Sequence, residues 1–433
     1  MGFIHEHIIL PLSDLAKGEK VHRHFRQLAK MEQATAEEMA AFQRQRLQLL
    51  MQHIASEVPF YREWFADNNI KPSDIQTPGD LRRLPIVDKA TMRREGVERF
   101  TAQLYPESKR MPARSSGSTG EPFSFYISKE AYSVNMAAKL RTWYQAGYRL
   151  GDPYMKIANG ARHGRLKTLQ DRVNRCVYVP FYSMGDDTLA AILVQIERTR
   201  PLFIRSYPVP LFLLAQYRNS HPGYHFTPRH VMTTGSILPD AYRAEIERAF
   251  GCDVIDSYSC EGTPNTYETT AHDGYRVTEA YGILEVLDDA DNPVRDGIGR
   301  VVSTDLWNLA TPFVRYDTQD LVEVRAGRIQ RIMGRECESL IVAGGQRYMV
   351  HSFVGFFQED DRPTKQSVTA YQVVKRKDGS ITFRLVVNEQ YNSDIERYII
   401  DFWHERLNIP VNVELVDEIP LMKNNKRLTI IDE

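Results

Sequence analysis

The chain has 433 residues, of which 42% are hydrophobic and 26% charged, an ordinary globular composition with room for two or three domains. Its formal net charge is −1 and it has no long basic run, which argues against nucleic-acid binding and for small-molecule partners. The apolar run 8–12 is too short for a membrane span, and the four scattered cysteines fit reduced thiols and a cytoplasmic location.

The amino-terminal part predicts an amphipathic helix followed by an extended connector. Within 35–65, apolar residues recur at i, i+3, i+4 and i+7: Leu47, Leu50, Met51 and Ile54. We expect this helix to end before Pro59. The segment 70–89 contains three prolines and predicts an extended connector.

A run of small hydroxyl residues and glycines follows, Arg-Ser-Ser-Gly-Ser-Thr-Gly-Glu-Pro at 114–122. Glycines let backbone N–H groups approach an anion, and hydroxyls add donors, so the run predicts a phosphate-binding loop. Its residues are Ser115, Ser116, Gly117, Ser118, Thr119 and Gly120. Because no lysine follows Gly120, the loop is not of the kinase type, and a flexible linker explains this stretch alone equally well.

Between 131 and 260, helical patterns alternate with short apolar runs. The apolar runs lie at 154–158, 202–204 and 252–255. This alternation predicts an α/β layered core with largely parallel strands. Around 281–304 the pattern becomes strand, turn, strand, which predicts a more antiparallel subdomain.

Two polar strings in the second half of the chain contain residues that could bind a nucleotide. Asp-Ser-Tyr-Ser-Cys-Glu-Gly at 256–262 follows an apolar run, so we expect it at the carboxyl end of a strand, where α/β sheets bind ligands. There Glu261 could hold Mg²⁺ and Tyr258 could stack on adenine, although a loop glutamate beside a core tyrosine is equally common. Asp320, in Val-Arg-Tyr-Asp-Thr-Gln-Asp at 314–320, could accept from both ribose hydroxyls.

The last hundred residues predict a small α+β domain. Strand patterns at 367–375 and 381–387 flank a turn, and a helix with one apolar face and a further strand at 411–415 follow. The string 334–345 before this domain is expected to be a hinge. Lys426 in the tail could bring positive charge to a reacting phosphate, although a solvated terminal lysine is more common.

In this order the strings resemble those of the adenylate-forming superfamily of acyl-CoA synthetases. Specifically, they are similar to its phenylacetate-CoA ligase-like branch, with CapK-type proteins and coenzyme F390 synthetases. The resemblance runs from about residue 40 to the carboxyl terminus and depends most on two strings together, Ser-Gly-Ser-Thr-Gly-x-Pro and Arg-Tyr-x-Thr-x-Asp. It implies an α/β protein with a large adenylation core of several subdomains over 1–334 and a mobile α+β lid over 335–433.

The resemblance also implies site residues and cofactors. The residues that would bind ATP and AMP are Ser115, Ser116, Gly117, Ser118, Thr119, Gly120, Ser236, Tyr258, Ser259, Asp320, Arg335 and Lys426. Lys426, Glu261 and Thr119 would be catalytic, with Mg²⁺ on Glu261. Cys337, Glu338 and Gly344 would lie at the hinge and the coenzyme A tunnel.

The activity implied is an AMP-forming ligase that makes an acyl adenylate from a carboxylic acid and ATP and transfers the acyl group to coenzyme A. Cys337 replaces the usual hinge aspartate, which slightly favours another acceptor: an amine, a sugar, a carrier-protein thiol, or AMP transfer as in F390 synthetases. A degenerate nucleotide-binding protein is disfavoured because Glu261 and Lys426 are both present.

The sequence says less about the substrate acid, the oligomeric state and a possible metal site. The region expected to wall the acyl pocket contains Tyr144, His163, Tyr182 and Tyr207, each of which is as readily a core or surface residue. A homodimer is the commonest assembly of soluble enzymes. A zinc site would draw on Cys252, Cys260, His272 and Cys337, but their spacing matches no standard ligand pattern, so buried reduced cysteines are the better interpretation.

Overall fold

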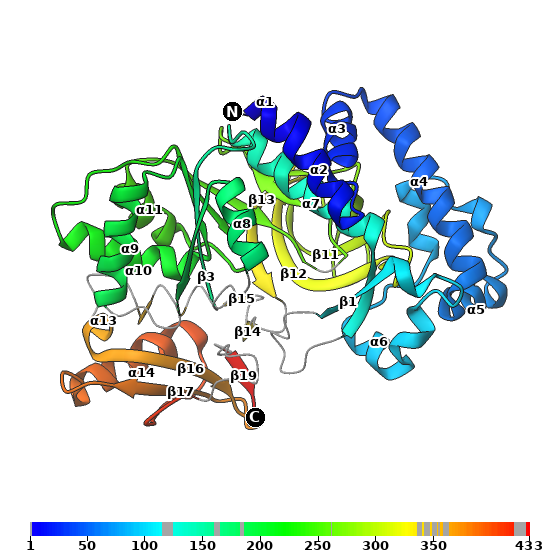
Figure 1. Cartoon of the computed structure of the whole chain (residues 1–433). Helices are drawn as coiled ribbons and strands as arrows, with labels where there is room; N and C mark the ends of the chain where they lie inside the picture. The colour runs from blue at the N-terminus through cyan, green and yellow to red at the C-terminus, as the bar shows by residue number, and fades with distance from the viewer. Residues whose placement is uncertain are drawn as a thin grey trace. The chain divides into compact units, whose positions relative to one another are not determined.

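The computed structural model describes residues 2–114, 124–159, 165–181, 186–260, 262–335, 340–341, 347–348, 353, 356–357, 363–419 and 430–433 (Figure 1). The chain forms two compact units. The first contains Met1–Ala113, Ser124–Thr318 and Val322–Ile332, and the second contains Arg114–Phe123, Gln319–Leu321 and Met333–Glu433. Among the described residues no helix combines the length and the apolar character of a membrane span.

Helices open the first unit: α1 (Gly2–Ile4), the π-helical turn η1 (His5–Ile9), α2 (Leu10–Lys17), α3 (Val21–Met31), α4 (Ala36–Glu57) and α5 (Pro59–Asp67). A capping box starts α4: the Thr35 hydroxyl accepts from the Glu38 N–H at 3.2 Å, and the Glu38 carboxylate accepts from the Thr35 N–H at 2.9 Å. The predicted apolar face of α4 is confirmed, because Leu47, Leu50, Met51 and Ile54 are fully buried. Pro59, expected to end this helix, begins α5.

Short turns occupy the segment that the sequence predicts as extended, so that expectation is partly wrong. Its turns are η2 (Pro72–Asp74) and η3 (Pro78–Arg83), each of which begins at a proline with its fixed φ. Beyond them lie α6 (Lys89–Glu95), η4 (Val97–Phe100), η5 (Glu107–Lys109) and β1 (Arg110–Arg114).

A seven-stranded sheet forms the α/β part of the first unit, in the order β4-β3-β5-β6-β7-β8-β9. Its strands are β3 (Tyr154–Asn159), β4 (Cys176–Phe181), β5 (Phe203–Ser206), β6 (His230–Thr234), β7 (Val254–Tyr258), β8 (Thr266–Glu268) and β9 (Tyr275–Val277). Pairing is parallel from β4 to β7, as predicted, and antiparallel from β7 to β9.

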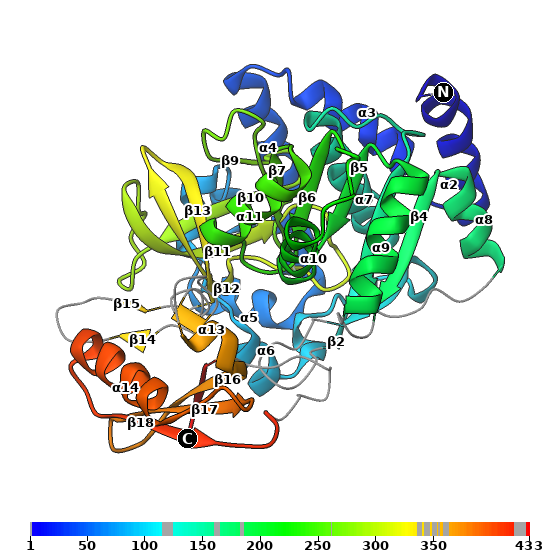
Figure 2. The same cartoon turned by 90° about the vertical axis from the view of Figure 1, so that its left-hand side faces the viewer.

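The helices of this part are α7 (Lys129–Gln145), α8 (Arg165–Val173), α9 (Asp186–Thr199), α10 (Pro208–Ser220) and α11 (Asp240–Phe250). Figure 2 shows α9, α10 and α11 along the side of the sheet that faces the viewer. Trp143 on α7 packs against a buried cluster that includes Phe203, Met232 and Ile255 of the sheet. Helices on a mostly parallel sheet are the expected α/β arrangement.

A second sheet has four strands in the order β10-β11-β12-β13. These strands are β10 (Gly282–Leu287), β11 (Gly297–Asp305), β12 (Tyr316–Arg325) and β13 (Arg328–Arg335). The antiparallel pairing of β10 with β11 confirms the predicted change of texture near residue 281. A further strand, β2 (Ser124–Ser128), pairs with β1.

The second unit contains the predicted α+β fold. Its sheet has the order β18-β17-β16-β19, from β16 (Val368–Lys375), β17 (Ile381–Val387), β18 (Val411–Leu415) and β19 (Ile430–Asp432). β16 and β17 form the expected antiparallel hairpin. Trp403 and Ile399 of α14 (Ser393–Leu407) pack on the sheet residues Phe383 and Leu385. The smaller elements are α13 (Thr364–Ser367), β14 (Leu340–Ile341) and β15 (Arg347–Tyr348).

Candidate functional site

Most of the predicted site residues lie outside the described residues. These are Ser115, Ser116, Gly117, Ser118, Thr119, Gly120, Glu261, Cys337, Glu338, Gly344 and Lys426. The structure describes Ser236, Tyr258, Ser259, Asp320 and the backbone of Arg335. It also describes the elements on either side of the glycine-rich run and of position 261, and these define how the site is built.

Buried side chains fix β2, the strand that follows the glycine-rich run. Asn308 accepts a hydrogen bond from the Ser128 N–H at 3.0 Å and donates to the Tyr126 carbonyl at 3.1 Å. The Thr311 hydroxyl accepts from the Tyr126 N–H at 3.1 Å. Because Asn308 and Thr311 are almost fully buried, these bonds are shielded from water and hold β2 in one position.

Asp305 holds the segment that carries Asn308. Its carboxylate accepts from the backbone N–H groups of Trp307 at 2.7 Å and Asn308 at 3.1 Å. Burial raises the pKa of Asp305, while these N–H donors and the Tyr281 hydroxyl oppose the increase. The segment 305–311 is therefore an internal brace for β2.

Phe313 joins β2 to two of the sequence strings. Its ring, 2% exposed, meets the ring of Phe125 edge-on at 5.0 Å and that of Tyr316 at 4.9 Å. Gly262 approaches so closely that a Cβ there would lie 2.5 Å from the Phe313 Cβ. The β2 strand, the string 256–262 and the string 314–320 thus meet at one side chain, and we call Phe313 with Phe125, Gly262 and Tyr316 the Phe313 framework.

Local hydrogen bonds fix the turn around position 261. The Cys260 N–H donates to the Thr263 hydroxyl at 2.6 Å, and the Thr263 N–H donates to the Cys260 carbonyl at 3.2 Å. Ser303 donates to the Gly262 carbonyl at 3.0 Å. Gly262 has a φ of 74°, a left-handed conformation that favours glycine. Both chain neighbours of position 261 are therefore held in place.

A buried carboxylate lies under the carboxyl ends of β6 and β7. Asp256, 4% exposed, accepts from the Thr233 hydroxyl at 2.5 Å and from the Tyr275 hydroxyl at 2.7 Å. Burial raises the pKa of Asp256, and the two hydroxyl donors oppose that increase. The Ser257 hydroxyl donates to the Thr233 carbonyl at 2.9 Å. These bonds fix the strand ends that lead to Ser236 and Tyr258.

Tyr258 and Thr318 come from two different strings and meet in the fold. The Tyr258 hydroxyl donates to the Thr318 hydroxyl oxygen at 3.4 Å, and Thr318 donates to the Val301 carbonyl at 3.0 Å. The Tyr258 ring is half-buried against a cluster that includes Val322. Asp320 lies two residues beyond Thr318 on β12 and is 7% exposed.

Ser236 and Ser259 follow the ends of β6 and β7. Ser259 is half-buried, whereas Ser236 is exposed and follows Gly235, whose φ is 80°. A Cβ on Gly235 would lie 2.8 Å from the Tyr207 ring, so a side chain there would displace Tyr207. Tyr207 itself is 39% exposed.

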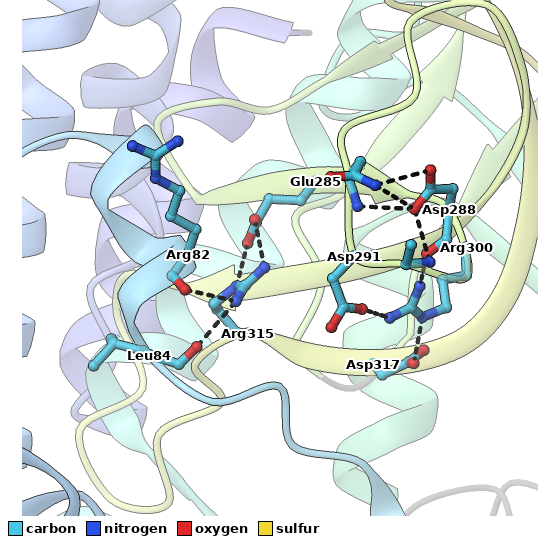
Figure 3. Close-up of polar contacts among 10 residues, drawn as sticks. Arg82, Leu84, Glu285, Asp288, Asp291, Arg300, Arg315 and Asp317 are labelled. Atoms are coloured by element: carbon cyan, nitrogen blue, oxygen red, sulfur yellow. Dashed lines mark hydrogen bonds and ion pairs between the residues drawn. The ribbon is translucent and has the colours of Figure 1, made fainter. Parts of the chain in front are cut away.

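Sequence reasoning gave no role to Arg315, which anchors β12 (Figure 3). Arg315 is 4% exposed and makes two contacts of 3.2 Å with the Glu285 carboxylate. It also donates to the Leu84 carbonyl at 2.9 Å. Burial raises the pKa of Glu285, and Arg315 opposes that increase. Backbone bonds of Val87 to Arg315 at 3.0 Å and Asp317 at 2.9 Å complete the attachment.

Arg300 makes a second arginine link in the same sheet (Figure 3). It donates to Asp317 on β12 at 3.0 Å, and to the Asp288 carbonyl and the Asp291 carboxylate of the turn after β10. No local pattern in the sequence predicts the partners of Arg300, which lie 9 to 17 residues away along the chain.

Tyr144, one of the acyl-wall candidates, belongs to the scaffold. Its hydroxyl donates to Glu6 at 3.1 Å and accepts from the Leu150 N–H at 3.1 Å, and its ring meets Phe25 edge-on at 4.7 Å. Burial raises the pKa of Tyr144 to about 12. His163 and Tyr182 lie outside the described residues.

The described cysteines, Cys176, Cys252 and Cys260, are thiols that form no disulfide. Burial raises the pKa of Cys252 to about 12, which keeps its thiol protonated. Within the ranges that the structure describes, no group of three His, Cys, Asp or Glu side chains could hold a metal ion.

Several known proteins are similar to this chain in sequence. The chain is 25% identical over 366 residues to the phenylacetate-coenzyme A ligase of Pseudomonas putida, covering 81% of this chain and 82% of that protein. It is 23% identical to protein CapK of Staphylococcus aureus, covering 69% and 68%. The chain is a relative of the adenylate-forming ligases of the phenylacetate-CoA ligase branch. No protein-family model matches the chain.

Solved structures of adenylate-forming ligases have the same fold. 2-Hydroxyisobutyryl-CoA ligase in its postadenylation state, bound to 2-HIB-AMP, superposes with a TM-score of 0.68 at 20% identity, covering 92% of this chain and 90% of that one. The anthranilate CoA ligase AuaEII bound to anthranoyl-AMP superposes with a TM-score of 0.52 at 18% identity, covering 76% and 66%. The predicted fold class, an adenylation core with layered α/β sheets and a small α+β domain, is confirmed.

Proposed function

We propose that this adenylate-forming relative is an AMP-forming ligase, which activates a carboxylic acid with ATP as an acyl adenylate and transfers the acyl group to coenzyme A. The observation that carries the proposal is the Phe313 framework, in which β2, the strand after the glycine-rich run, the turn at 260–263 and the Arg-Tyr-x-Thr-x-Asp string meet at one side chain. The chain has this framework within a fold that acyl-adenylate-forming CoA ligases share.

The chain's own residues provide for charge neutralisation. ATP with Mg²⁺ would supply the adenylyl group and the pyrophosphate leaving group. A carboxylate that approaches a phosphate is repelled, so donors must already be oriented around it. The N–H and hydroxyl groups of 115–120 would surround the phosphates, with β2 as their fixed end. Asp320 would accept from the ribose and Tyr258 would lie beside the adenine.

Glu261 and Lys426 complete the proposed site. Glu261 would hold Mg²⁺, since a carboxylate in a turn fixed on both sides can be oriented without further ordering. Lys426 would bring a positive charge to the reacting carboxylate and α-phosphate. Arg335 would assist near the ribose, and Cys337, Glu338 and Gly344 would belong to the hinge and the coenzyme A path.

A second acceptor class is supported by Cys337, which stands where the branch usually has an aspartate. With an altered hinge, the same adenylation step could serve an amine, a sugar or a carrier-protein thiol. Turnover with and without coenzyme A separates these acceptors. Equal AMP release in both conditions would exclude the thioester reaction.

The direct test is carboxylate-dependent ATP–pyrophosphate exchange, measured across a broad panel of acids. Lys426→Ala should lower exchange about 100-fold or more, because one charged donor at a reacting phosphate contributes roughly that much. ATP binding should persist. Lys423→Ala, three residues earlier in the same tail, is the matched control and should exchange normally. Unchanged exchange in Lys426→Ala would remove that lysine from the mechanism, and no exchange with any acid would overturn the proposal.

We also propose a small-molecule acid as the partner, a cytoplasmic location in keeping with cysteines outside disulfides, and a lid movement of 335–433 against 1–334. A homodimer is the assembly we expect, and sedimentation of the full chain tests it.

A further inference from the structure

The first helical segment of the chain, 2–17, turns apolar side chains to solvent. The segment is continuous through α1, η1 and α2, because Ile4 and Ile9 at the two joins keep the dihedral angles of a right-handed helix. Its large exposed side chains recur at spacings of three and four residues, which aligns them along one side of a helix. We call them the apolar stripe, and between 49% and 81% of each residue is exposed: Phe3, Ile4, Ile8, Leu12 and Leu15.

The side of the segment that faces the protein is polar. His5 and Asp14 are its fully buried members. The His5 Nε2 donates to the Val173 carbonyl at 2.8 Å, and the Asp14 carboxylate accepts from the His22 N–H at 2.7 Å. A surface helix normally buries its apolar side and exposes its polar side. The 2–17 segment does the reverse, and exposed apolar patches of this kind mark contacts with a protein or a membrane.

Helix α3, the next helix along the chain, exposes cations. Arg23, Arg26 and Lys30 are exposed and follow one another at spacings of three and four residues, so they share one face of α3. No ion pair within the described part of the chain includes any of the three. We call these three residues the basic face.

The other charges near the basic face do not balance it. Lys17 and Lys20 are also exposed, and Lys20 pairs with Glu130 at 2.8 Å. Glu32, directly after α3, accepts from Arg141 at 2.9 Å. The carboxylates within 2–31 are buried or half-buried: Glu6, Asp14 and Glu19. The exposed charge of 2–31 is therefore cationic, although the whole chain has a formal net charge of −1.

The apolar stripe and the basic face belong to neighbouring helices of the first unit. The bond from His22 to Asp14 joins α3 to α2, and the rings of His7 and His22 meet edge-on at 6.3 Å. Helices in contact have axes about 8–10 Å apart. This distance is close to the Debye length of about 8 Å at physiological ionic strength. The cations of α3 therefore act on any charged surface that covers the apolar stripe.

Two kinds of surface could cover the stripe, and the charges favour one of them. A second copy of the chain, related by a two-fold axis, would present the same residues and would oppose cations with cations. An anionic bilayer offers an apolar boundary beside negatively charged headgroups, which matches the stripe and the basic face together. The apolar run 8–12 is too short to span a membrane, but it can lie in the plane of the interface.

We propose that the 2–17 segment binds an anionic membrane surface, with the apolar stripe at the boundary of the acyl chains and the basic face of α3 against the headgroups. The test is flotation of the full chain with two kinds of vesicle: phosphatidylcholine alone, and equal parts of phosphatidylcholine and phosphatidylserine. We expect binding to the anionic vesicles that weakens as salt is added.

Substitutions separate the two contributions. Leu12→Gln/Leu15→Gln should weaken binding to the anionic vesicles at least about tenfold, because two apolar side chains no longer enter the lipid. Arg23→Gln/Arg26→Gln should weaken it roughly fivefold for each arginine removed. Both pairs of side chains are exposed, so urea unfolding of these variants should match that of the wild type.

Matched controls change the same residue types elsewhere on the first unit. Leu49→Gln/Leu104→Gln removes two leucines that are 49% and 80% exposed, comparable to Leu12 and Leu15. Arg44→Gln/Arg198→Gln removes two exposed arginines of α4 and α9, the same change of charge as in the α3 variant. Both controls should bind the anionic vesicles as the wild type does.

Three results would overturn the inference: no binding to the anionic vesicles, equal binding to both kinds of vesicle, or equal loss in the variants and their matched controls. Sedimentation without lipid adds a fourth. If Leu12→Gln/Leu15→Gln converts a dimer to a monomer, the stripe is an interface between copies of the chain instead. Flotation needs neither ATP nor an acid, so its outcome is independent of the proposed ligase activity.

Discussion

Gly262→Ala tests the Phe313 framework at its tightest contact. The φ of 74° at Gly262 would cost an alanine about 1–2 kcal/mol. In addition, its Cβ would lie 2.5 Å from the Phe313 Cβ and 2.7 Å from the Cγ, distances that force Phe313 to move. Overpacking of a well-packed core costs about 1–3 kcal/mol more. We therefore expect a loss of about 2–5 kcal/mol in the free energy of unfolding.

Gly18→Ala separates the two contributions. Gly18 has a φ of 64°, close to that of Gly262, and among the described residues no atom outside its chain neighbours lies within 4 Å of the position its Cβ would take. This control should lose only the backbone cost of about 1–2 kcal/mol. Urea unfolding of both variants measures the difference.

ATP–pyrophosphate exchange by the same two variants measures whether the substitution disturbs the candidate site. Displacement of Phe313 would shift the turn at 260–263 and β2 together, because both contact its ring, so Gly262→Ala should also lose at least about tenfold in ATP–pyrophosphate exchange. Gly18→Ala should exchange normally. If Gly262→Ala is no less stable than Gly18→Ala, the framework is not as closely packed as these distances require, and the reasoning is refuted.

Two further predictions concern buried charge. Arg315→Met should lower the free energy of unfolding by about 3 kcal/mol, because it leaves the half-buried Glu285 carboxylate unpaired. The double variant Arg315→Met/Glu285→Leu should recover part of that loss in urea unfolding, and a double variant no more stable than the single one would contradict the ion-pair explanation. Burial lowers the pKa of His230 in the folded protein, so the unfolded chain binds protons more readily and stability should fall as the pH drops below about 6.5. His230→Gln should lose less stability between pH 7.5 and 5.5 than the wild type, and an equal loss would show that His230 does not contribute.

The sequence by itself determined the features that depend on neighbours along the chain. The repeat of Leu47, Leu50, Met51 and Ile54 predicted the buried face of α4, since a helix brings residues three and four apart to one side. Period-two alternation predicted the β16–β17 hairpin for the same kind of reason. The glycine-rich run and the Arg-Tyr-x-Thr-x-Asp string indicated the resemblance, because each is a local pattern that the sequence shows directly.

Only the tertiary structure decided which distant residues meet. Phe313 and Phe125 are separated by nearly two hundred residues, and Arg315 and Leu84 by more than two hundred, so no local period records either pair. The neighbouring positions of Lys156 and Arg205 depend on the register of two strands, and a shift of one residue would turn either side chain to the opposite face of the sheet. Strand register and core packing are set by the whole sheet at once, and for that reason the brace around the site could not be predicted from the sequence strings.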